Sequence, residues 1–233
     1  MKELYECPIC GGKMSATSRI VECTFCGKKE WTDYLCSRSH YICEECRIST
    51  PDEIIKKTCK HTREKDPTKI AELLMKHPAM PMHGPEHHPL VSAALLASMR
   101  NNGLFNIDDA MIDNAIARAK RVPLGSCGAW GACGAAIGVG IAFSVALDID
   151  MMSGEKRSMV LRLVSKILEE ISRLNGPRCC KASVMIALGV ARTFLADKYG
   201  VVFDDEKVKC TFRDRNLQEC LKEACSFYSD RRG

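Results

Sequence analysis

Apolar residues recur at helical spacing through most of the chain after residue 66. In NIDDAMIDNAIARAKR, residues 106–121, they fall on one face, with acidic residues in the first turn and basic residues in the last. The segment SMVLRLVSKILEEISRL, residues 158–174, repeats this pattern on one broad face. Shorter helices are expected over residues 68–76 and, after a proline-rich interruption, over LVSAALLASMR. The pattern predicts a mainly α fold with a helical domain of about six to seven helices.

One passage alternates like a strand, and the first part of the chain is organised differently. We expect a small hairpin in VVFDDEKVKCTF, residues 201–212, and a last helix over residues 215–228. The sequence contains no βαβ alternation, phosphate-binding loop, dinucleotide fingerprint or nucleophile elbow, which argues against those enzyme classes. We expect a small zinc-binding module over residues 1–50, a linker over residues 51–66 and a helical cysteine-rich domain over residues 67–233.

The first 50 residues carry cysteine pairs at the spacing of metal sites. CPIC and CTFC are two copies of the turn in which paired thiolates bind one tetrahedral ion, and CSRSHYICEEC adds three cysteines and one histidine. Closed sites with four soft or imidazole ligands are typical of structural zinc, as in zinc-ribbon and treble-clef-like modules. We expect two zinc ions, whose removal should unfold the module. The predicted ligands are Cys7, Cys10, Cys23, Cys26, Cys36, His40, Cys43 and Cys46.

The spacing allows two ways of pairing these ligands. In sequential pairing, the first two pairs bind one ion and the last two pairs bind the other. In cross-braced pairing, the first pair joins the third and the second joins the fourth. A short helix is expected to start with Thr50 as N-cap and Pro51 in its first position. Cys59 and His61 lie in the charged run that we assign to the linker, and neither has a predicted role.

Composition and charge limit the classes of function. Fifteen cysteines without a preceding signal peptide indicate a reduced, cytoplasmic protein whose cysteines serve metal or redox chemistry. The apolar run from Cys133 to Leu147 is too short and too rich in glycine to span a membrane. The formal net charge of +5 falls to about +2 with seven thiolates and two zinc ions bound. Without a basic stripe, nucleic acid is not an expected partner.

Two turns place further cysteines in front of apolar helices. These turns are PLGSCGAWGACGAAIGVG, residues 123–140, and NGPRCCK, residues 175–181. At a helix N-terminus, free N–H groups and the positive end of the helix dipole favour a thiolate over a thiol. The alternative is that these cysteines are small buried apolar residues and that the glycines allow close packing. We expect a redox or cofactor-binding centre formed by Cys127, Cys133, Cys179 and Cys180, completed by Cys210, Cys220 and Cys225 as ligands or resolving thiols.

A histidine-rich loop, MPMHGPEHHP, precedes the helix over LVSAALLASMR. Its three prolines hold three histidines and a glutamate in a short, stiff segment. Imidazoles can bind metal or transfer protons near neutral pH, so this loop is expected to supply a ligand or a general acid–base to the cysteine centre. The candidates for a catalytic role are His83, Glu86, His87 and Cys179.

The combination of MHGPEHH, CGxxGxCGAAxGxG, GPRCCK and a cysteine-rich C-terminus resembles an uncharacterised cysteine-rich domain family of anaerobic archaea and bacteria. Its members occur alone or fused behind a SAM-dependent methyltransferase domain, and the resemblance covers nearly the whole chain. The chain is also distantly similar to the redox-active C-GCAxxG-C-C family, although here a glycine follows Cys133 and the closing glycine, Gly138, comes one residue late. These resemblances imply redox or iron–sulfur chemistry in anaerobes.

The leading hypothesis is therefore an iron–sulfur-cluster-binding or persulfide and redox-thiol protein of anaerobic metabolism. It would act in sulfur transfer or beside a protein partner, either a methyltransferase or a redox, radical or sulfur enzyme, and the sequence is compatible with an oligomer. Two other functions stay open. A zinc-dependent adaptor without catalysis would be colourless and contain zinc only. A nucleic-acid-binding accessory factor of tRNA modification would act through the N-terminal module and bind in a salt-dependent way.

Overall fold

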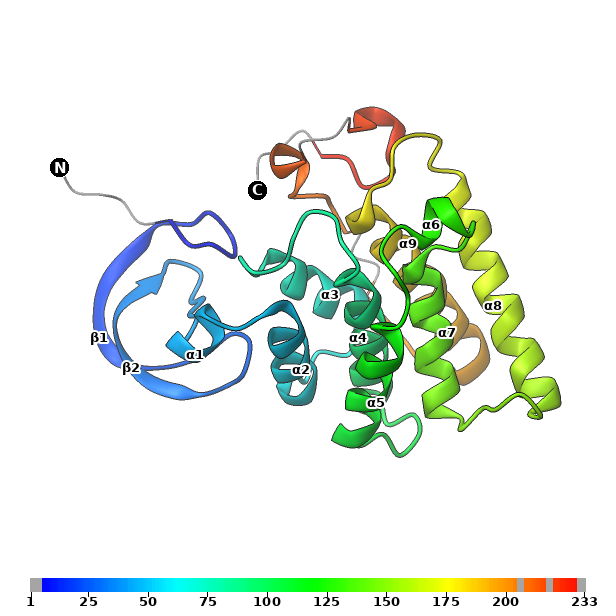
Figure 1. Cartoon of the computed structure of the whole chain (residues 1–233). Coiled ribbons are helices and arrows are strands. Elements are labelled where there is room, and N and C mark those ends of the chain that lie inside the picture. Colours follow the sequence, from blue (N-terminus) through cyan, green and yellow to red (C-terminus); the bar gives the residue numbers. More distant parts are fainter. Residues whose placement is uncertain (1–5, 205–207, 217–219, 230–233) are drawn as a thin grey trace.

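The structure, a computed structural model, describes residues 6–204, 208–216 and 220–229. These residues form nine α-helices, two 3-10 helices and one two-stranded sheet, so the chain is mainly α, as its periodicity predicts. Figure 1 shows a strand-containing module beside a body of helices, with the C-terminal segment lying across one end of that body. No helix among the described residues combines the length and the apolar character needed to cross a membrane.

The N-terminal module is a two-stranded antiparallel ribbon followed by one helical turn. β1 (Met14–Glu22) pairs with β2 (Lys29–Cys36), and α1 (Glu44–Arg47) comes after β2. The ribbon exposes large apolar side chains, including the cross-strand pair Ile20 and Trp31. Cysteine is the commonest residue type among those that the module buries. A segment with so small an apolar core needs another source of stability.

His77 connects this module with the helical body. It ends α3 (Pro67–Lys76), and its Nε2 lies 3.0 Å from the backbone oxygen of Cys46. Its ring packs edge-on against Phe25, with 4.7 Å between ring centroids, and both side chains are fully buried. The two parts of the chain therefore share a small apolar contact.

The predicted start of a short helix at Thr50 and Pro51 is confirmed, but the segment that follows is not an exposed linker. Thr50 and Glu53 form a capping box at the start of α2 (Pro51–His61). One face of α2 is buried against α4 (His87–Asn101) and α5 (Asp109–Ala119), and it includes the fully buried Cys59. The lysines that suggested a linker lie on the outer face, where two of them pair with one aspartate of α5. The charge run of this segment is thus one side of an amphipathic helix.

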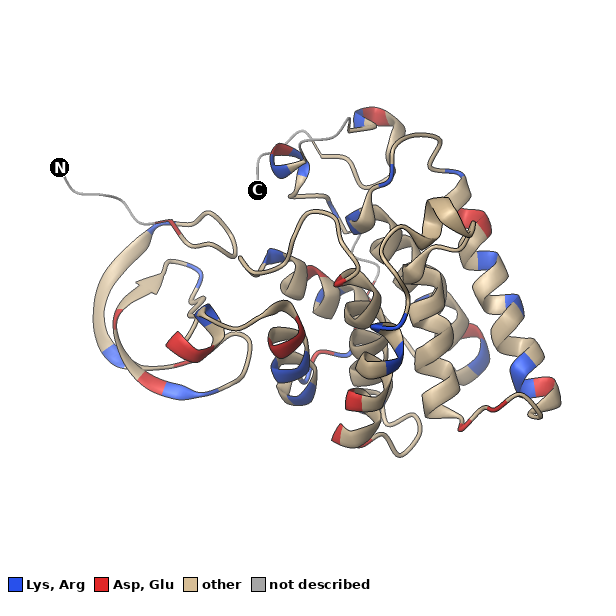
Figure 2. Cartoon of the chain, in the orientation of Figure 1, with Lys and Arg blue, Asp and Glu red and all other residues tan. Residues whose placement is uncertain are grey.

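α4 (His87–Asn101) is the central helix of the body. It contacts α2, α3, α5 (Asp109–Ala119), α7 (Gly134–Ala146) and α9 (Cys180–Tyr199), and nearly all of its residues are buried. α8 (Gly154–Ser172) packs on the outside against α7 and α9. In Figure 2, α7 carries no charged residue, whereas α8 carries charges of both signs along its length. This difference matches an inner and an outer helix.

The periodic segments form helices within a few residues of their predicted bounds. Residues 68–76 lie in α3, residues 106–121 contain α5, and residues 158–174 contain most of α8. α4 begins earlier than predicted, at His87, because a proline such as Pro89 is tolerated in the first turn of a helix. Two of the histidines expected in a loop therefore belong to the first turn of α4.

The C-terminal segment differs from its prediction. The described part of residues 201–212 contains no strand, and residues 215–228 form no α-helix where they are described. Two 3-10 turns, Arg213–Arg215 and Lys222–Ala224, occur instead. The apolar residues of this segment, including Phe203 and Phe227, pack singly against the helical body, so they do not build one face of a hairpin or a helix. The part of the expected hairpin and helix over residues 205–207 and 217–219 lies outside the described residues.

Candidate metal centres

The ligand pairs of the module form two groups. The first group contains the first and third pairs, Cys7 with Cys10 and Cys36 with His40. Sγ of Cys10 lies 3.5 Å from Sγ of Cys36 and 3.2 Å from Nδ1 of His40. Together with Sγ of Cys7, these ligand atoms all lie within 4.8 Å of one another. Sulfurs around a tetrahedral zinc ion with Zn–S bonds of about 2.3 Å are about 3.8 Å apart. The group therefore fits one metal ion.

The second and fourth pairs form the other group. Sγ of Cys26 lies 3.6 Å from Sγ of Cys43, and Cys23 and Cys46 complete a set of four thiols within 4.8 Å. The pairing is cross-braced, which decides between the two arrangements that the spacing allowed. The structure thus has two groups that could hold metal ions, one with three thiols and an imidazole and one with four thiols, as the predicted ligands require.

Backbone N–H groups point at several of these sulfurs. The N–H of Arg38 donates to Sγ of Cys36 at 3.3 Å, and the N–H of Cys43 donates to Sγ of Cys23 at 3.5 Å. Burial by itself would raise the pKa of Cys23, but the backbone N–H donors outweigh it and lower that pKa. For Cys43, burial dominates and raises the pKa to about 11. A cation is needed to keep all thiols of such a group deprotonated.

A separate cavity of about 280 Å³ lies at one end of the helical body. Both cysteine-bearing turns reach it, because Cys127, Cys133, Cys179 and Cys180 all line its wall. The histidine loop reaches it through His87. Segments that are well separated along the chain are thus brought to one place, as the sequence predicts for these residues.

Three helices begin at this cavity. α4 starts at His87, α7 has Cys133 as its N-cap, and α9 has Cys179 as its N-cap. A one-turn helix, α6 (Ser126–Ala129), carries Cys127. The free N–H groups and the positive dipole ends of the three longer helices, together with the guanidinium of Arg178 in the wall, favour negative charge in the cavity.

His87 has the hydrogen-bonding arrangement of a metal ligand. Its Nδ1 lies 3.1 Å from the backbone oxygen of Gly84, so Nδ1 carries the proton that it donates there. Its Nε2 is buried and has no hydrogen-bond partner among the described residues. Burial lowers the pKa of His87 to about 3, which leaves the ring neutral with a free lone pair on Nε2. Metal-binding histidines commonly hold the other ring N–H in such a bond to a backbone carbonyl.

Gly84 connects this histidine with one of the thiols. While its carbonyl accepts from His87, its backbone N–H opposes the rise that burial causes in the pKa of Cys180. One residue therefore orients two side chains of the cavity. Sequence analysis gave Gly84 no role, and its position inside the histidine loop was the only signal available.

The glycines of residues 123–140 have two different uses. A Cβ at Gly134 would lie 2.2 Å from ring atoms of His88, and one at Gly138 would lie 2.9 Å from the backbone oxygen of His88. These two glycines allow α7 to approach α4 closely, as the packing alternative proposed. A Cβ at Gly128 or Gly131 would meet nothing within 4 Å, so these two glycines border open space.

The structure divides the expected cysteine centre into two groups. Cys180 lines only the larger cavity, whereas Cys179 also lines a smaller one of about 50 Å³. The charges of Cys133 and Cys127 act on the pKa of Cys180, and those of Cys210 and Cys225 act on the pKa of Cys179. Among the described residues, no three thiols of either group lie within 4.8 Å of one another, unlike those of the module. The smaller cavity brings together Cys179, Cys210, Cys220 and Cys225.

The expectation that helix N-termini lower the pKa of Cys179 and Cys180 is wrong. Burial raises the pKa of both thiols. The N–H of Ala182 at Cys179 and the N–H of Gly84 at Cys180 act in the opposite direction but do not outweigh burial. Desolvation of a thiolate thus exceeds the effect of these backbone donors here.

Two predicted candidates lie outside both cavity walls as the structure describes them. Nε2 of His83 lies 3.0 Å from Oδ1 of Asn216 in the C-terminal segment, so His83 faces away from the larger cavity. Glu86 is the N-cap residue of α4 without a side-chain capping bond, and its Oε2 is buried without a partner. Of the three candidates from the histidine loop, His87 is the one in a cavity wall.

Comparison with known proteins gives one match. A family model described as a family of unknown function (DUF5714) matches residues 55–228. The match starts within α2 and includes the helical body and the described C-terminal segment, but none of the ligands of the module. No curated protein and no solved structure matches the chain.

Proposed function

The chain belongs to this family of unknown function, and we propose that it binds an iron–sulfur cluster in the larger cavity. The cluster ligands are Cys127, Cys133 and Cys180, with Nε2 of His87 as the fourth. The observation that carries this proposal is the buried Nε2 of His87, which lacks a partner in a wall that also contains three thiols. Thiolates with imidazole are an established ligand set for iron–sulfur clusters.

The size of the cavity supports a polynuclear group over a single ion. A volume of about 280 Å³ is many times the roughly 15 Å³ that one water needs. A single zinc ion would require several sulfurs about 3.8 Å apart, whereas no three ligand atoms of this cavity lie within 4.8 Å of one another. A cluster spreads its ligands over several metal atoms and so accepts wider spacing.

The electrostatics of the cavity support an anionic group. An iron–sulfur centre with thiolate ligands carries negative charge, and three helix N-termini and Arg178 surround the cavity with positive potential. The N–H of Gly84 also stabilises the thiolate of Cys180. Once bound, the cluster would supply redox chemistry, while the chain's own residues hold and orient it.

The ligand shell also suggests how a partner gains access. Cys127 is exposed, and two apolar side chains of the same turn, Leu124 and Trp130, are exposed close to it in sequence. We propose that a protein partner, a methyltransferase or a redox or sulfur enzyme of anaerobic metabolism, docks at this turn and exchanges electrons or sulfur with the centre. In this account the two groups of the module bind zinc and stabilise its fold.

The test is analysis of iron, acid-labile sulfide and zinc, with a visible spectrum, on the full chain purified and reconstituted without oxygen. We expect two zinc ions together with iron and sulfide. Replacing one ligand, as in Cys133→Ala or Cys180→Ala, should reduce the iron and the visible absorbance and leave zinc unchanged. Cys59→Ala is the matched control, because Cys59 is a buried cysteine of α2 that lines neither cavity.

Two results would contradict the proposal. A colourless protein that contains zinc only, even after reconstitution, would favour a zinc-dependent adaptor. Full iron content and absorbance in both Cys133→Ala and Cys180→Ala would show that these thiols are not ligands.

A further inference from the structure

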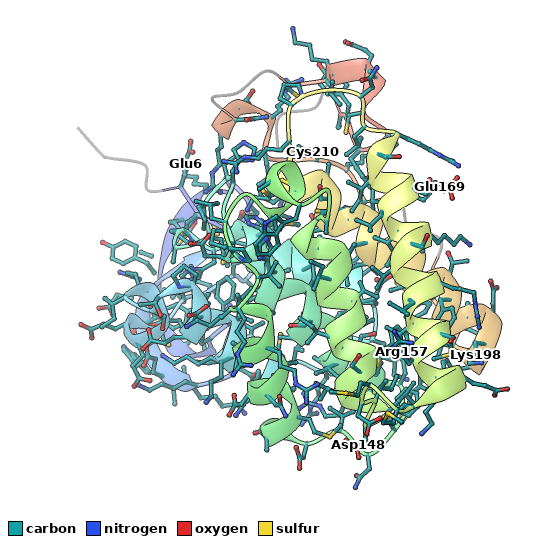
Figure 3. The ribbon with its side chains drawn as sticks, turned by 45° about the vertical axis from the view of Figure 1, so that its right-hand side comes forward. Glu6, Asp148, Arg157, Glu169, Lys198 and Cys210 are labelled. Atoms are coloured by element: carbon teal, nitrogen blue, oxygen red, sulfur yellow. The ribbon has the colours of Figure 1, made fainter. Side chains whose placement is uncertain are left out.

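Four thiols that are not part of this ligand set meet on the other side of the start of α9. Cys179 is the N-cap of α9, and the C-terminal segment brings Cys210, Cys220 and Cys225 to the same cavity of about 50 Å³. Figure 3 shows Cys210 at the end of the helical body where α6 lies. We infer that these four thiols bind a second iron–sulfur cluster.

Cys210 sits in the same kind of turn as a predicted metal ligand of the module. The N–H of Phe212, two residues later, donates to Sγ of Cys210 at 3.4 Å, and the N–H of Arg213 also hydrogen-bonds that sulfur. In the module, the N–H of Arg38, again two residues later, donates to Sγ of Cys36 at 3.3 Å. Backbone donors in this position stabilise a thiolate. A turn that the chain uses for one metal group therefore recurs at Cys210.

A buried positive charge lies beside these thiols. Lys181 lines the same cavity and is 2% exposed. Its Nζ lies 3.4 Å from the backbone oxygen of Met75 and 4.9 Å from the ring centroid of Phe212. Neither contact supplies a negative charge, and a buried ammonium is costly without one. An anionic cluster with four thiolate ligands would supply that charge.

The described part of the C-terminal segment has little regular structure and a small core of its own. Its described residues have two 3-10 turns as their helical structure, and Phe212 is its one buried apolar side chain. A backbone bond of 2.7 Å from the N–H of Cys210 to the oxygen of Phe227 joins its two ends. Like the module, the segment combines a small core with several cysteines, which is the situation in which a bound metal stabilises a fold.

The spacing of the thiols favours a cluster over a third zinc ion. No three of them satisfy the 4.8 Å separation that both module groups satisfy. The neighbouring residues Cys179 and Cys180 would then bind different clusters, so the two centres are joined through one peptide bond. The four-thiolate centre does not depend on the proposed function, because it shares no ligand with the cluster proposed for the larger cavity, although Cys179 lines both cavities.

The test compares two double variants of the full chain, prepared and reconstituted with iron and sulfide without oxygen. Cys210→Ala with Cys225→Ala removes two ligands of the smaller cavity, and Cys127→Ala with Cys133→Ala removes two ligands of the larger one. We expect each to keep about half of the iron and sulfide of the unmodified chain, with zinc unchanged. Cys59→Ala should keep all of it. Helical circular dichroism checks that the variants are folded.

The outcomes separate this inference from the proposed function. If only the variant Cys210→Ala with Cys225→Ala loses iron, the result supports the cluster in the smaller cavity. The same result contradicts the cluster proposed for the larger cavity. Full iron in that variant, or a third zinc ion lost from it in place of iron, would overturn the inference.

A second measurement needs no variant. Electron paramagnetic resonance of the unmodified chain reduced with dithionite should show two clusters whose signals broaden or split through mutual coupling, since their ligands are adjacent. A signal that integrates to one uncoupled cluster would overturn the inference.

Discussion

The cysteines of the N-terminal module and those of the helical body are positioned by different means. In the module each pair of ligands comes from one turn, and the four ligand atoms of a group lie within 4.8 Å. In the body the thiols come from helix starts and from the C-terminal segment, and they line cavities with wider spacing. Local turns thus position the closely spaced ligands of the module, whereas tertiary packing positions the more widely spaced thiols of the body.

This difference predicts different dependence on metal. The module has a small apolar core and two groups that could hold metal ions, so we expect bound ions to be its main source of stability. The body surrounds the nearly fully buried helix α4 and has a large core of its own. Metal in the module should therefore determine folding, whereas metal in the body should determine chemistry.

The largest expected effect follows from removing zinc. Structural zinc contributes apparent binding free energies of about 10–16 kcal/mol in small zinc modules, so a strong chelator should unfold residues 6–46. Hydrogen exchange followed by mass spectrometry should show lost protection in β1 and β2 and retained protection in α4. Equal loss of protection in both regions would contradict the contrast between the module and the body.

The next effect concerns the imidazole ligand. His87→Cys would replace a neutral ligand with a thiolate and should lower the reduction potential of its cluster by on the order of 100 mV, since histidine ligation raises cluster potentials. Potentiometry monitored by visible absorbance measures the shift. His61→Cys is the control, because His61 lies at the end of α2, contacts Glu22 and lines neither cavity. An unchanged reduction potential in His87→Cys would show that His87 is not a cluster ligand.

A smaller effect tests the packing that brings the helix starts together. A Cβ at Gly138 would lie 2.9 Å from the backbone oxygen of His88, so Gly138→Ala should reduce the free energy of unfolding by about 1–3 kcal/mol. Gly189→Ala in α9 meets nothing within 4 Å and should instead stabilise by about 0.5–1 kcal/mol. Urea denaturation measures both changes. Equal changes would show that α7 and α4 are not in close contact.

The smallest effect lies where the module joins the body. Thr50→Ala removes the capping box of α2 and should cost about 1 kcal/mol of unfolding free energy. Thr193→Ala, at an exposed position inside α9, should be neutral or slightly stabilising. Thermal denaturation of the zinc-loaded chain distinguishes the two variants. An unchanged thermal stability in Thr50→Ala would show that the capping box does not stabilise α2.

Features that depend on neighbouring residues could be predicted from the sequence. The ligands of the module follow from CxxC spacing, and the bounds of α5 and α8 follow from apolar periodicity. The pairing of ligands required three dimensions, because either pairing satisfies the local turns. The charged run that suggested a linker over residues 51–66 lies on the outer face of α2, which a charge pattern alone does not distinguish from a linker.

Features that depend on packing could be predicted only in part. Cys127, Cys133 and Cys180, predicted to form one centre, line one cavity, but the separation of Cys179 from Cys180 depends on what packs on each side of α9. His87 was chosen for its residue type, whereas its free Nε2 follows from a bond to Gly84 that no sequence pattern signals. The strand and helix expected near the C-terminus do not occur among the described residues there, because their apolar side chains pack singly on the body.

X-ray absorption at the zinc and iron edges of the full chain, purified without oxygen, tests the central contrast most directly. The two ligand groups of the module should appear as zinc with four sulfur or nitrogen neighbours and no nearby metal. The thiols that line the two cavities of the body should appear as ligands of iron, with sulfur neighbours and a further shell of iron atoms. An iron edge without iron–iron scattering, or no iron at all, would contradict the assignment of clusters to the helical body.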